Sequence, residues 1–241
     1  MLSEKLSNGS ELKLAVVVPE VRVADVAFNT AQIKNALANL KSGNPVWIIF
    51  PRLCLTGSTC GDLFRQKILQ DAALQALLDL VPLTSNATSR VLVGLPLAIG
   101  SEVYEGLALL SGGQVESLMV ARFPYSPALS PSVDVQEGTT VNLRGKMVPL
   151  DFGQSFTFGQ AEILLGQQPP SNFGNDLLIN LINLPALAPA ELFPQTAFNP
   201  ATRQGITVIC SAGASESTTD QVFSEKPKSG KTGFALQPRL N

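Results

Sequence analysis

The order of apolar segments in the first hundred residues restricts the fold of this chain more than any other feature. Short β-branched apolar runs at 12–18 and 46–50 each end at a proline, which is typical of buried strands. Apolar side chains recur at helical spacing over 25–40, where Asp25 is the expected cap, and again over 62–81. This strand, helix, strand, helix order predicts an α/β layered domain.

Strand-like runs dominate the rest of the chain. The turn signal Ser111-Gly-Gly predicts a hairpin between 106–110 and 115–120. Other strands are expected at 90–97, 147–150, 155–158, 161–165, 177–184 and 206–210, with a loop rich in Ser, Pro and Gly at 124–140. We expect one domain over 1–217 and a polar tail over 218–241.

Composition restricts the partners and the location. The net charge is −2 and the basic residues are scattered, so no surface matches a nucleic-acid backbone. No run approaches the roughly 18 apolar residues of a membrane span, and the first residues lack the pattern of a secretory signal. A cytoplasmic protein is therefore expected. Charged residues make up only 15% of the chain, which favours an oligomer or an obligate partner.

Histidine is absent, which excludes Ser-His and Cys-His catalysis and imidazole metal ligands. The three cysteines, Cys54, Cys60 and Cys210, have no metal-ligand spacing, and their odd number argues against a disulfide framework. We expect reduced thiols, no metal and no cofactor. Any chemistry must use carboxylates, lysines or a thiol.

Four segments in order carry a family resemblance: PEVRVAD at 19–25, FPRLCLTGSTCGDLFRQ at 50–66, VGLPL at 93–97 and VYEGLA at 103–108. Together they resemble the N-terminal glutaminase domain of glutamine-dependent NAD synthetases, within the nitrilase (carbon-nitrogen hydrolase) superfamily. Weaker similarity follows in GKMVP at 145–149 and GITVICSAGAS at 205–215. The second segment is the most specific, because it matches over many consecutive residues.

The resemblance implies a four-layer α-β-β-α sandwich of the nitrilase type. It also implies assembly through outer helices, either as a homo-oligomer or with an active nitrilase-like or NAD-synthetase partner. No Ser-Gly-Gly-x-Asp pyrophosphatase loop occurs, so NAD synthesis by this chain alone is not expected.

Members of the family hydrolyse amides with a Cys nucleophile, a Glu general base and a Lys that stabilises the oxyanion. The resemblance places Arg52 at the glutamate position, and a guanidinium cannot accept a proton. It places Ala121 at the lysine position, where a slip of one residue would bring Arg122 instead. It places Leu184 at the cysteine position. The sequence therefore predicts that the catalytic residues are lost.

Other candidates are better explained as structural or solvated residues. Cys54 and Cys60 resemble packing residues of the family motif, although the charge of Arg52 would favour a nearby thiolate. Lys228-Ser-Gly-Lys-Thr-Gly233 resembles part of a phosphate loop, but Glu225 replaces the first glycine of the motif. The carboxylates of Glu102, Glu105 and Glu116 are expected at turns and strand edges in contact with solvent.

Three hypotheses follow. The first is a catalytically degenerate nitrilase-fold protein, a pseudoenzyme, that acts as a structural or regulatory subunit. The second is a diverged carbon-nitrogen hydrolase acting on an amide, with relocated residues around Arg52, Cys54 and Arg122. The third is a small-molecule sensor that binds an amide or carboxylate through Arg52, in a pocket that also includes Leu184.

Overall fold

The computed structural model describes most of the first two thirds of the chain and isolated strands beyond. The described residues are 2–5, 11–40, 46–85, 89–122, 124, 126–132, 138–153, 155–158, 161–165, 177–181, 206–210 and 233–234.

The larger of two sheets has eight strands, in the order β1-β2-β3-β4-β5-β6-β8-β7. Their bounds are β1 Leu2–Lys5, β2 Glu11–Val16, β3 Trp47–Ile49, β4 Arg90–Ile99, β5 Glu102–Ser111, β6 Gln114–Ala121, β7 Thr140–Leu143 and β8 Lys146–Gly153. The pairs β2–β3 and β3–β4 are parallel, whereas β4, β5 and β6 form an antiparallel meander. The sheet is therefore mixed.

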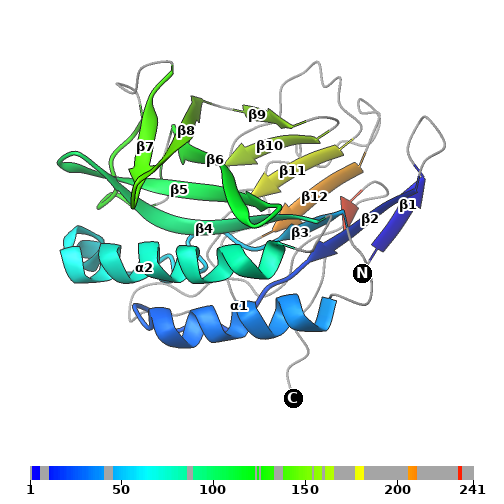
Figure 1. The fold of residues 1–241 in the computed structure, drawn as a ribbon, viewed down its shortest axis with the longest axis horizontal. Helices are drawn as coiled ribbons and strands as arrows, with labels where there is room; N and C mark the ends of the chain where they lie inside the picture. Colours follow the sequence, from blue (N-terminus) through cyan, green and yellow to red (C-terminus); the bar gives the residue numbers. More distant parts are fainter. Residues whose placement is uncertain are drawn as a thin grey trace, which may run out of the picture.

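Both parallel connections pass through a helix. Helix α1, Val26–Leu40, links β2 to β3, and helix α2, Lys67–Leu80, links β3 to β4 between the short 3-10 helices η2, Gly61–Arg65, and η3, Val81–Thr84. Asp25 caps α1 as predicted, because its carboxylate accepts the N–H of Phe28 at 3.0 Å. The two helices lie side by side on one face of the large sheet (Figure 1).

The second sheet has five strands, in the order β13-β12-β11-β10-β9. Their bounds are β9 Ser155–Phe158, β10 Ala161–Leu165, β11 Leu177–Leu181, β12 Ile206–Cys210 and β13 Gly233–Phe234. It packs against the face of the large sheet that the helices leave uncovered, as Figure 1 shows. Three layers, α-β-β, are thus described. A second helical layer would fall on residues outside the described ranges.

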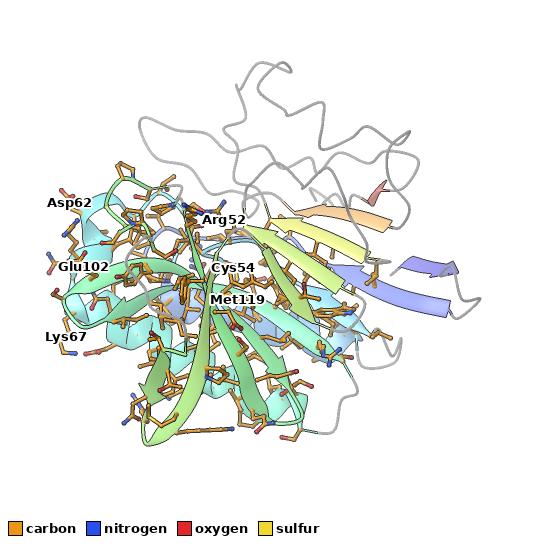
Figure 2. All side chains as sticks on the ribbon, turned by 90° about the horizontal axis from the view of Figure 1, so that it is seen from above. Arg52, Cys54, Asp62, Lys67, Glu102 and Met119 are labelled. Atoms are coloured by element: carbon orange, nitrogen blue, oxygen red, sulfur yellow. The ribbon has the colours of Figure 1, made fainter. Side chains whose placement is uncertain are left out.

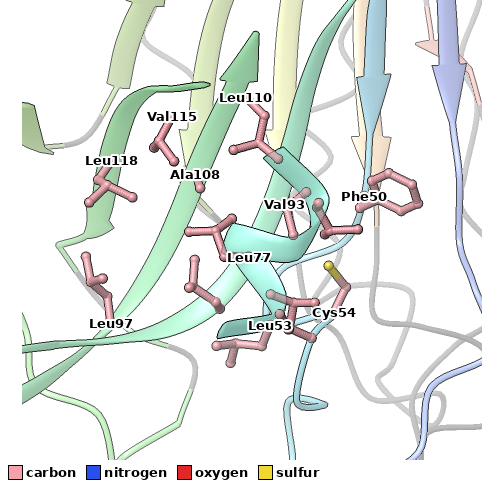
Figure 3. Packing of buried hydrophobic residues seen from close by; sticks show 14 of the residues in the cluster. Phe50, Leu53, Cys54, Leu77, Val93, Leu97, Ala108, Leu110, Val115 and Leu118 are labelled. Carbon is pink, nitrogen blue, oxygen red and sulfur yellow. The ribbon is translucent and has the colours of Figure 1, made fainter. Parts of the chain in front are cut away.

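Two apolar cores hold these layers together. The helix-side core lies between the large sheet and the helices and includes Ile33 of α1. It also includes Leu77 of α2 and Val93 of β4 (Figure 3). The inter-sheet core includes Leu107 of β5 and Ile179 of β11. Because successive side chains of a strand point to opposite faces, the central strands supply both cores, and their sequences are nearly continuous apolar runs.

The sequence predicted most of these elements. Every expected strand and both helices are present, although β5 begins at Glu102 instead of residue 106, and the predicted second helix is divided among η2, α2 and η3. Strands β1, β7 and β13 were not predicted. Gly233 and Phe234, expected in a polar tail, pair with β12 in parallel register. The predicted domain boundary at residue 217 lies outside the described residues.

Candidate functional site

The candidate site begins at the turn that follows β3. After Phe50 and Pro51 the chain reverses tightly, since Leu53 adopts a left-handed φ of 52° and its carbonyl oxygen accepts the N–H groups of Thr56 at 3.0 Å and Gly57 at 2.8 Å. A left-handed backbone is unfavourable for a branched side chain such as leucine. The side chain of Leu53 is buried in the helix-side core, and this packing holds the backbone of the turn in the strained conformation.

Gly94 of β4 allows this turn to lie against the sheet. A Cβ atom on Gly94 would stand 2.4 Å from the backbone nitrogen of Leu53 and 2.8 Å from the carbonyl oxygen of Pro51. The carbonyl oxygen of Gly94 accepts the N–H of Leu55 at 3.2 Å. Glycine is therefore required at this position, because any side chain would push the turn away from β4.

The turn places Arg52 in a buried ion pair with Glu105 of β5. The guanidinium Nε donates to carboxylate Oε1 at 2.5 Å. Arg52 retains 5% of its accessible surface and Glu105 retains 1%, so both charges are removed from solvent. Burial of an unpaired charge is very costly, so each charge of this pair lowers the free-energy cost of burying the other. Figure 2 shows Arg52 at the margin of the described residues.

Glu105 stands on the face of β5 that meets the second sheet. Leu107 and Leu109 of the same strand belong to the inter-sheet core, and side chains two residues apart in a strand share a face. The register pairs Gly106 with Val120, and its continuation by one residue brings Ala121 opposite Glu105. The predicted base position, Arg52, is thus paired with Glu105, and the predicted lysine position, Ala121, lies on the strand next to Glu105.

One donor of this cluster has no partner among the described residues. Arg52 Nη2 is shielded from solvent and makes no hydrogen bond to any described group. Among the buried side-chain polar atoms described, only Ser132 Oγ shares this condition. A buried N–H without an acceptor costs about 1 to 3 kcal/mol, so this donor is a destabilising feature of the cluster.

Cys54 and Cys60 belong to a different environment. Both are buried in the helix-side core, where Figure 3 shows Cys54 beside Leu53. The Cys54 thiol donates to the carbonyl oxygen of Gly94 at 3.6 Å, and the Cys60 thiol donates to that of Thr56 at 3.1 Å. Neither forms a disulfide. This placement is that of packing residues, opposite the inter-sheet face that carries Glu105.

The remaining predicted positions are only partly described. Ala121 is completely buried in the inter-sheet core, and Arg122 follows it with an exposed side chain. Leu184 lies outside the described residues, so its distance from Arg52 is not defined. Of the phosphate-loop-like segment 228–233, only Gly233 is described, in β13.

The expectation that Glu105 is a solvated carboxylate is wrong. Glu102 and Glu116 match it: Glu102 accepts a hydrogen bond from Ser130, and Glu116 forms a half-exposed ion pair with Arg90 at 3.6 Å. Glu105 instead lies inside β5 and is buried. The sequence does contain a sign of this burial, because Glu105 is two residues from Val103 and two from Leu107 in an apolar stretch.

Among the described residues, no group of three or more His, Cys, Asp or Glu side chains is arranged to hold a metal ion. None of the helices in the described ranges is long and apolar enough to cross a membrane.

Comparison with known proteins supports the resemblance. No family model matches the chain. It is 27% identical over 176 residues to the glutamine-dependent NAD(+) synthetases of Mycobacterium bovis and Mycobacterium tuberculosis, a match that covers 72% of this chain. The chain spans 23% of the length of these curated relatives.

Solved structures show the same fold at lower identity. A glutamine-dependent NAD(+) synthetase from Cytophaga hutchinsonii superposes with a TM-score of 0.70 and 17% identity, over 90% of this chain and 38% of that one. An amidase of the nitrilase superfamily from Nesterenkonia AN1, a C-to-S mutant, superposes with a TM-score of 0.63 and 16% identity, over 89% of this chain and 82% of that one. The chain therefore has the predicted nitrilase-type α/β fold. Another mutant of the Nesterenkonia amidase carries acrylamide added at its active site cysteine.

Proposed function

We propose that this chain is a nitrilase-fold protein without amide-hydrolysing activity, which acts as a structural or regulatory subunit. The observation that carries the proposal is the buried ion pair between Arg52 and Glu105, at the position where the resemblance expects a general base. Amide hydrolysis by a thiol requires a base that accepts the thiol proton and a donor that stabilises the oxyanion.

The two described positions hold neither a base nor a lysine. Arg52 is a permanent cation, and the carboxylate paired with it among the described residues, that of Glu105, already accepts its Nε–H. Ala121 offers a methyl group where a lysine ammonium is expected. Loss of one member of a catalytic set lowers the rate by about 10⁴ to 10⁶, so two such losses support an inactive site.

Acrylamide provides a direct test of the missing nucleophile, because it adds to the active site cysteine of a related amidase mutant. In the folded chain incubated with acrylamide, Cys54 and Cys60 are expected to remain unmodified, as measured by mass spectrometry of the peptides that contain them. The urea-unfolded chain is the matched control and is expected to gain one acrylamide mass for each of its three cysteines. Stoichiometric addition to Cys54 or Cys60 in the folded chain favours the diverged hydrolase instead.

The subunit role is tested separately. A low content of charged residues, 15%, supports a chain that buries part of its surface in an oligomer or against an active nitrilase-like partner in the cytoplasm. Affinity purification from the native host, followed by light scattering, is expected to yield a complex of defined mass. A monomer without a stoichiometric partner at every concentration rejects this role.

A second candidate function, a small-molecule sensor, is favoured by Arg52 Nη2. This buried donor has no acceptor among the described residues, and a ligand oxygen would satisfy it. Thermal-shift measurements with glutamine and related compounds are expected to show stabilisation that disappears in Arg52→Met. An equal shift in both proteins excludes a sensor site at Arg52.

A further inference from the structure

We draw no further inference here: the strongest candidate, the outward face of α1 and α2 with exposed Ala27, Ala31 and Ala38 and the 81% exposed Ile68, carries nothing, because no contact among the described residues shows what covers it.

Discussion

Removal of either partner of the Arg52–Glu105 pair is expected to destabilise the chain strongly, whereas removal of both is expected to cost much less. At 2.5 Å and an effective dielectric constant of about 20, two unit charges attract by about 7 kcal/mol. Desolvation of both ions offsets most of this attraction, so the pair contributes little net stability. A single substitution removes the ion-pair partner of the other buried charge, at a cost of about 3 to 5 kcal/mol.

The assay is a double-mutant cycle of Arg52→Met and Glu105→Leu, measured by urea and thermal unfolding. Each single variant is expected to lower Tm by about 6 to 20 °C for a chain of this size, and the coupling energy is expected to exceed about 2 kcal/mol. The matched control is the half-exposed pair Arg90–Glu116, 3.6 Å apart, whose coupling is expected to be about 0.2 to 1 kcal/mol. Additive effects at Arg52 and Glu105 would refute the reasoning.

Four further predictions concern the surroundings of the site. Gly94→Ala is expected to destabilise by at least about 1 to 3 kcal/mol, since the new methyl group meets the backbone of Leu53 at 2.4 Å; an unchanged urea midpoint contradicts this. Asn29→Ala removes the side chain that donates to the carbonyl oxygens of Arg22 at 2.8 Å and Leu55 at 3.2 Å. The free energy of unfolding is expected to fall by about 2 kcal/mol or more, whereas Asn35→Ala, at an exposed position of the same helix, is expected to change it very little. Leu77→Ala in the helix-side core is expected to cost about 2 to 5 kcal/mol, and Ile68→Ala, 81% exposed on the same helix, less than about 0.5 kcal/mol; similar losses in the two variants would argue against the described packing of α2. Cys54 and Cys60 are expected to react with a disulfide reagent only at the rate of chain opening, and burst-phase reaction of either thiol in the folded chain would show that it is accessible.

The sequence predicted elements where one physical signal dominates. The apolar runs of β3 and β4 and the helical spacing of α1 and α2 are strong because each segment buries its side chains in a defined pattern. Strand β7 was missed because Val141 and Leu143 alternate with polar residues in a short stretch after a predicted loop. β1 and β13 are similarly short, and their pairing depends on neighbours distant in the sequence.

The sequence analysis named one of the two residues of the buried ion pair. Motif similarity identified Arg52 as the residue at the base position, an assignment that stays a prediction, and the structure describes its side chain as buried. Glu105 was missed because burial of a carboxylate depends on its partner, which lies 53 residues earlier in the chain and is itself a charged residue. No local pattern in either segment records this pairing.

The most direct test of the absence of amide hydrolysis is ammonia release by the purified chain from glutamine, asparagine, acetamide and butyramide at high enzyme concentration. The account predicts a rate equal to that of Arg52→Met and of the buffer alone for each amide. Saturable ammonia release that Arg52→Met abolishes would contradict it, because a guanidinium paired with Glu105 would then take part in the reaction.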